Sequence, residues 1–66
     1  MTGRVVLWAA DKRYARILGY DRRRYFAPQS EFIDVLSFLP GQLVTFVPIE
    51  SDKGMRAKEV RLLERA

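Results

Sequence analysis

Five segments of strand length, separated by short turns, fill most of this 66-residue chain. They lie at residues 4–10, 14–20, 24–28, 42–50 and 55–63. The first is rich in β-branched and aromatic residues, and the fourth alternates so that Val44 and Phe46 share one face. Short strands joined by short turns are typical of small barrels, which also leave no sheet edge exposed. We therefore predict an all-β fold, a small closed barrel built from residues 1–66 as one domain.

Two segments also allow a helical interpretation. In the tail, Ala57, Val60 and Leu63 have helical spacing among good helix formers, so propensity alone favours a helix over residues 55–66. Between the third and fourth strands, Ser30 is a candidate cap for a helical turn that ends before residues 40–41, a Pro-Gly pair. We expect a strand in the tail, because a small barrel needs its fifth strand.

The composition excludes much chemistry. The chain has no His and no Cys, so it has no His-dependent nucleophile system and no thiolate or imidazole zinc site. No spacing of its carboxylates specifies a metal, so we expect no enzyme, no metal and no cofactor. The longest apolar run, residues 5–10, is far too short to span a membrane. With no Cys, the chain fits a reducing compartment, and we expect a cytoplasmic protein.

The charge indicates an acidic partner. Twelve Lys and Arg residues oppose eight Asp and Glu residues, giving a net charge of +4. Nucleic acid is the commonest partner of a small basic domain. The sequence therefore favours a basic binding module.

Several blocks of sequence occur in an order that points to one family. Residues 3–8 read G-R-V-V-L-W, residues 41–46 read G-Q-L-V-T-F, and residues 53–60 read K-G-M-R-A-K-E-V. The chain thereby resembles the cold-shock domain family, whose blocks include G-K-V-K-W-F-N, G-Q-x-V-x-F and K-G-x-x-A-x-x-V. The resemblance covers residues 3–60. It implies a five-stranded antiparallel barrel of the OB type that binds single-stranded RNA or DNA with low sequence specificity.

The resemblance also implies a binding face. Bases would stack on three aromatic residues, which are Trp8, Tyr14 and Phe26. Lys12 matches the Lys of the family's motif and would contact phosphate. The charge of this sequence adds further candidate phosphate contacts, which are Arg13, Arg16, Arg22, Arg23 and Arg24, with Arg4 and Arg56 as extensions. The chain departs from the family at several aromatic positions. Leu7 stands where the family has Trp, and Arg16 stands where it has a second Phe.

A second hypothesis comes from the fourth strand. Leu43, Val47 and Ile49 alternate with the inward Val44 and Phe46, so they form an apolar stripe on the outer face. A bulge that turns part of this strand inward is the structural alternative. The stripe suggests a barrel used for contact with a protein partner or for homodimerisation. Translation-initiation barrels of similar size, which bind RNA on the ribosome, are a third interpretation.

Overall fold

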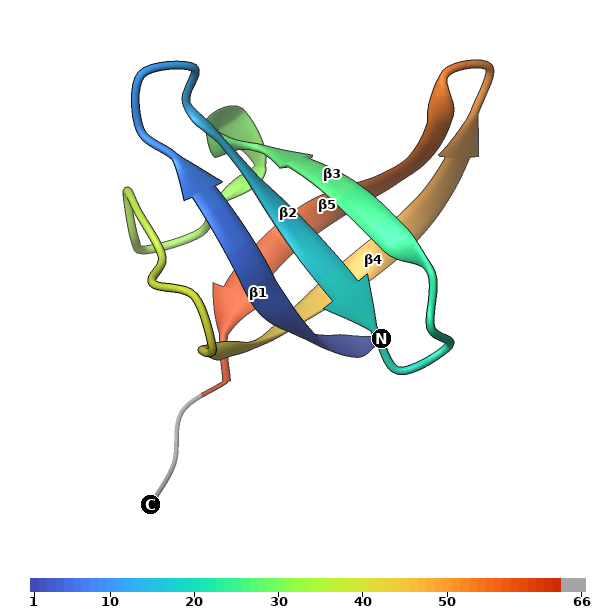
Figure 1. Ribbon diagram of the computed structural model, residues 1–66, viewed down its shortest axis with the longest axis horizontal. Helices are drawn as coiled ribbons and strands as arrows, with labels where there is room; N and C mark the ends of the chain where they lie inside the picture. The colour runs from blue at the N-terminus through green and yellow to red at the C-terminus, as the bar shows by residue number, and fades with distance from the viewer. Residues whose placement is uncertain (64–66) are drawn as a thin grey trace.

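A computed structural model describes residues 1–63 of the chain, and this part contains five strands and one short 3₁₀ helix (Figure 1). The elements are β1 (Thr2–Ala9), β2 (Tyr14–Gly19), β3 (Arg24–Pro28), η1 (Gln29–Glu31), β4 (Leu43–Ser51) and β5 (Gly54–Leu62). The five strands lie within two residues of their predicted bounds. The predicted all-β fold is confirmed.

The strands form a closed barrel in the order β1-β2-β3-β5-β4. In Figure 1, β1, β2 and β3 lie side by side, while β4 and β5 cross behind them. Four of the strand pairings are antiparallel, but β3 and β5 pair in parallel, through Phe26 and Arg56. The barrel is therefore of the OB type as expected, although it is not wholly antiparallel. The parallel contact closes the barrel between two strands that are far apart in the chain.

The tail forms a strand and not the helix that its spacing allowed. In β5, Ala57 and Val60 are both buried although they are three residues apart. A bulge explains this spacing, because the β4–β5 register shifts between Thr45 and Val47, and Glu59 has a φ of 50°. The extra residue in β5 turns both side chains inward. The bulge thus produces the spacing that imitates a helix; residues 64–66, at the end of the proposed helix, lie outside the described part.

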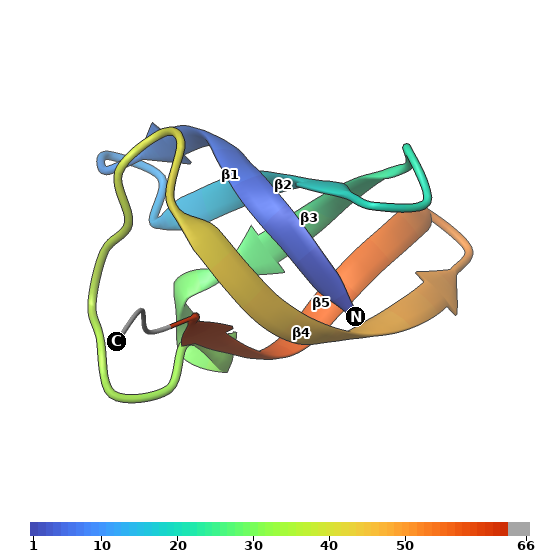
Figure 2. The same cartoon turned by 90° about the horizontal axis from the view of Figure 1, so that it is seen from below.

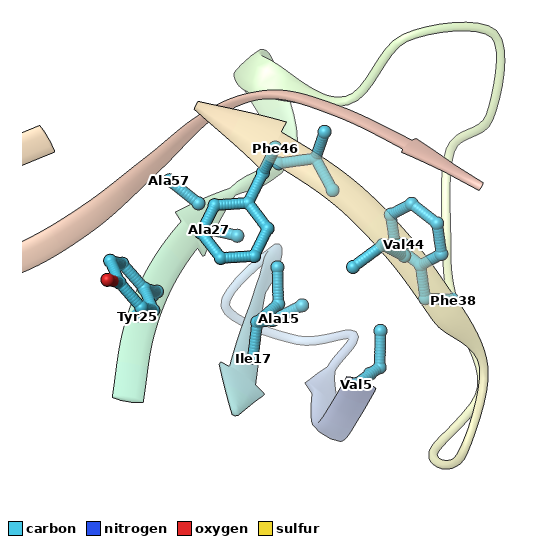
Figure 3. Close-up of a cluster of buried hydrophobic side chains, with 10 residues drawn as sticks. Val5, Ala15, Ile17, Tyr25, Ala27, Phe38, Val44, Phe46 and Ala57 are labelled. Carbon is cyan, nitrogen blue, oxygen red and sulfur yellow. The ribbon is translucent and has the colours of Figure 1, made fainter. Parts of the chain in front are cut away.

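The core occupies the inside of the barrel, as Figure 3 shows. Its buried members come from every strand and from one loop, and are Val5, Ala15, Ile17, Tyr25, Ala27, Phe38, Val44, Phe46, Ala57 and Val60. Phe38 comes from the segment between η1 and β4, which spans one side of the barrel in Figure 2. The helical turn expected here is reduced to η1, in which Ser30 lies inside the turn and does not cap it, since the N-cap position is Pro28. Leu36, in the segment that follows, is 78% exposed. Phe38 thus covers the barrel from a loop.

Gly3 lets β1 and β2 approach closely. Gly3 pairs with Gly19 and also with Val44 of β4. A Cβ atom on Gly3 would lie 2.8 Å from the Leu18 carbonyl oxygen and 2.8 Å from Ile17 Cγ2. The backbone oxygen cannot turn aside as a side chain can. Gly3 is therefore needed for strand packing.

A hydrogen-bonded pair fixes the turn between β2 and β3. The Tyr25 hydroxyl donates to Asp21 Oδ2, and the Arg23 backbone N–H donates to Asp21 Oδ1 at 3.0 Å. These two bonds hold the pKa of Asp21 below its ordinary value of 3.8, and the bond from Tyr25 has the larger effect. The same bond to Asp21 raises the pKa of Tyr25 above 10.0. The Tyr25 ring is buried, so the turn is tied to the core.

We predict that Gly3→Ala lowers the free energy of unfolding by about 1–3 kcal/mol, because the added methyl group overpacks the contact between β1 and β2. Urea denaturation followed by circular dichroism measures this change. A variant as stable as the unsubstituted chain would contradict the close approach at Gly3.

A second prediction concerns acid stability. A carboxyl whose pKa is lowered by folding stabilises the fold above its unfolded pKa, and this contribution is lost as the pH falls through the folded pKa. The chain should therefore lose stability below about pH 4, and Tyr25→Phe, which removes the main cause, should lose less. Urea midpoints at neutral and acid pH test this. Equal losses in the two proteins would show that the Asp21–Tyr25 bond does not set the pKa of Asp21.

Candidate nucleic-acid interface

The outer side of β2, β3 and β5 carries two aromatic and two arginine side chains. Arg16 pairs across β2 and β3 with Phe26, and Phe26 pairs across β3 and β5 with Arg56. Directly paired residues point to the same side of a sheet, and Tyr14 lies two residues before Arg16 on that side. We call Tyr14, Arg16, Phe26 and Arg56 the aromatic–arginine face.

The two rings of this face lie against each other. Their centroids are 5.1 Å apart, and their planes meet at 37°. Tyr14 and Phe26 are each half-buried, while the inward neighbours Ala15 and Ala27 are fully buried. The two rings therefore form one apolar platform outside the core. A platform of this kind suits a flat aromatic ligand.

A guanidinium group lies over each ring. Arg16 Cζ is 5.8 Å from the centroid of the Tyr14 ring, and Arg56 Cζ is 5.2 Å from the centroid of the Phe26 ring. Such cation–π contacts are worth about 0.5–1 kcal/mol at exposed sites. The same groups can also stack on a base or pair with a phosphate. The face therefore combines two kinds of contact that a nucleic acid requires.

Apolar and basic residues continue to alternate around the face. Leu7 of β1 pairs with Arg16, and Ile49 of β4 pairs with Arg56. Further along the strands, Leu18 lies between Arg4 and Arg24. Arg4 is already engaged, since its Nη1 donates to the Gly41 carbonyl at 2.8 Å. Arg24 is exposed and points outward on β3, two residues before Phe26.

Trp8 lies on the other side of the sheet from Tyr14 and Phe26. It pairs with the fully buried Ala15, is half-buried, and packs on Phe32 with ring centroids 5.6 Å apart. A bulge in β1 between Val5 and Leu7 causes this placement. Strict alternation from Val5 would send Trp8 outward, and the extra residue reverses it. The structure thus separates Trp8 from the stacking set expected from the sequence, and Leu7 takes the outward place.

The other basic residues that the sequence predicted for the interface lie at the two ends of β2. Lys12 and Arg13 are exposed in the turn before β2, beside Tyr14 in the chain, and the Arg13 carbonyl accepts a 2.9 Å hydrogen bond from the Gln29 N–H. Arg22 and Arg23 are exposed in the turn after β2. Figure 1 shows these two turns at opposite ends of the strand. The basic residues therefore flank the platform and do not form one patch.

Arg56 is the residue of the face that sequence reasoning placed least well. The sequence had suggested it only as an extension of the positive charge. Its contact with Phe26 depends on the parallel pairing of β3 with β5, which joins residues thirty positions apart. The K-G-x-R turn predicts where a strand starts and that it pairs with the strand before it. It does not indicate that the strand also pairs with β3.

The apolar stripe on β4 points outward as its alternation predicts. Val44 and Phe46 are buried, Val47 is 45% exposed, and Leu43 and Ile49 are half-buried. Basic residues pair with all three members of the stripe. Leu43 faces Arg4, Val47 faces Lys58, and Ile49 faces Arg56. The bulge in this region lies in β5, so it does not turn the stripe inward.

Among residues 1–63, no group of three acidic side chains is placed to hold a metal ion. No helix of this described part has the length and apolar character to cross a membrane. No model of a known protein family matches the chain, and no curated protein does so either. The geometry of the outer faces is therefore the feature that points to a function.

We predict that Trp8→Ala lowers the free energy of unfolding by about 2 kcal/mol, because Trp8 packs on Phe32 and the core. It should leave the affinity for a labelled oligothymidine unchanged. Trp8→Phe, which keeps a ring at this position, is the matched control for stability. If Trp8→Ala stays folded and stops binding the oligonucleotide, Trp8 belongs to the interface.

Proposed function

We propose that this chain binds single-stranded RNA or DNA, with low sequence specificity, on the aromatic–arginine face. The observation that carries this proposal is the Tyr14–Phe26 ring pair with Arg16 and Arg56 lying over it. The resemblance of the sequence to cold-shock domains supports the same function. The protein acts in this proposal as a binding module without cofactor or catalytic activity.

The face favours a single strand because its apolar part consists of ring surfaces. Bases stack on aromatic side chains only when they are unpaired and free to leave their own stack. Neither ring is part of the core cluster, so neither has to leave it to meet a base. Stacking accepts every base, because each has a flat aromatic surface, so low sequence specificity follows.

The flanking basic residues supply contacts with phosphates. Arg24 lies beside the face, two residues before Phe26 on β3, while Lys12 and Arg13 lie beside Tyr14 at one end of β2. Arg22 and Arg23 lie at the other end. A strand that follows β2 would therefore meet positive charge before and after the platform. If it contacts about four phosphates, the logarithm of its affinity should fall with the logarithm of salt at a slope near −3.

The alternative of homodimerisation through β4 meets an electrostatic obstacle. Val47 and Ile49 lie beside Lys58 and Arg56. A two-fold contact centred on this stripe would bring these basic residues close to those of the second copy. Like charges across an interface oppose association. The same charges favour an acidic ligand. Ile49 also lies next to the aromatic–arginine face, because it pairs with Arg56, which pairs with Phe26.

We predict that Tyr14→Ala and Phe26→Ala each weaken binding of oligothymidine by about 1–3 kcal/mol, since each removes one stacking surface. Fluorescence anisotropy of a labelled oligonucleotide measures the affinity, at several salt concentrations. Val47→Ala is the matched control, because it removes an apolar side chain from the outside of β4. Thermal unfolding verifies that each variant is folded.

Unchanged binding by both ring variants would place the nucleic acid elsewhere and contradict the proposal. If the unsubstituted chain binds no oligonucleotide even at low salt, the β4 stripe becomes the leading candidate. Its role would then be tested by the effect of Leu43→Lys on the oligomeric state.

A further inference from the structure

We infer that the face holds two neighbouring unpaired bases, each between a ring and a guanidinium, with Tyr14 and Arg16 around one base and Phe26 and Arg56 around the other. This inference rests on the proposed function and specifies how its ligand is held. It assigns the two arginines a stacking role, whereas general phosphate contact would need only their charge.

The placement of the two arginines is the first argument. Arg16 follows Tyr14 by two residues on the same strand and side, and it pairs across the sheet with Phe26. Arg56 pairs with Phe26 from the opposite side. Strand pairing therefore holds both side chains at the edges of the platform. By contrast, Arg22 and Arg23 lie in a turn and have no ring beneath them among the cation–π contacts of residues 1–63.

The spacing is the second argument. Flat groups in contact are about 3.5 Å apart, so a base between a ring and a guanidinium needs about 7 Å between them. The present distances from Cζ to ring centroid are 5.8 Å at Tyr14 and 5.2 Å at Phe26. Each guanidinium would have to retreat by only about 1–2 Å. Both arginines are exposed, so this movement disturbs no core packing.

The shape of the guanidinium is the third argument. A guanidinium is flat and weakly hydrated, so it stacks on aromatic surfaces, whereas an ammonium group is compact and strongly hydrated. If Arg16 and Arg56 act only by charge, lysine should replace them. If they cover bases, lysine should not. The two roles therefore give opposite results for the same substitution.

The ring spacing indicates two adjacent nucleotides. The centroids of Tyr14 and Phe26 are 5.1 Å apart. Two bases on these rings are therefore neighbours in a strand, and the duplex partner of either base would have to be removed. Polyanions without bases would bind only through charge.

The test compares the double variant Arg16→Lys/Arg56→Lys with the unsubstituted chain. The probes are a labelled oligothymidine and an abasic oligonucleotide of equal length, which has the same phosphates and no bases. We expect the double variant to bind oligothymidine at least about fivefold more weakly, as the loss of a stacking contact implies. Its affinity for the abasic strand and its salt slope should not change, because the charge is kept. Arg61→Lys is the matched control, because Arg61 is exposed on β5 outside the face, and it should bind both probes as the unsubstituted chain does.

A loss of less than about fivefold for oligothymidine would overturn the inference while leaving the proposed function intact. An equal loss for the abasic strand would also overturn it, because the lysines would then have altered a phosphate contact. Failure of the proposed function has a different signature. In that case the unsubstituted chain binds oligothymidine no better than the abasic strand.

Discussion

The structure depends on the two-sided pairing of β5. This strand joins β4 along one edge and touches β3 along the other, and it thereby closes the barrel. The bulge at Glu59 allows β5 to bury both Ala57 and Val60 while it bends from one neighbour to the next. Closure also creates the candidate site, because it brings Arg56 over the Phe26 ring. The pairing of β5 with β3 therefore both closes the barrel and assembles the aromatic–arginine face.

A small chain has few apolar side chains, so their distribution between core and surface is informative. Tyr25, Phe38 and Phe46 are buried in the core. Tyr14 and Phe26 instead lie outside the barrel, where they stabilise it less than burial would. Apolar atoms on a protein surface are ordinary, but two rings in contact under two guanidinium groups are a specific arrangement. This arrangement distinguishes the face from scattered exposed residues.

Local pattern predicted the first four strands, since turn residues and apolar or aromatic residues mark them, whereas the fifth was expected because a small barrel needs it. Two bulges account for the features that the local pattern predicted wrongly or left ambiguous. The bulge in β1 reversed the side on which Trp8 lies, and the bulge in β5 imitated helical spacing. A bulge depends on pairing between strands, so no single segment reveals it. The burial of Phe38 and the contact of Arg56 with Phe26 depend on tertiary structure in the same way.

The face separates two contributions that a nucleic-acid ligand combines. Four exposed basic residues lie in the turns at the two ends of β2, and the rings of Tyr14 and Phe26 lie between these turns. Charge in turns acts over the range of the Debye length and weakens with salt. Ring contact requires direct approach and depends little on salt. The salt concentration therefore sets how strongly any polyanion is attracted. The aromatic platform favours those polyanions that carry unpaired bases. The guanidinium groups of Arg16 and Arg56 are both charged and flat. Because other residues supply the charge in the turns, we assign these two arginines to base stacking.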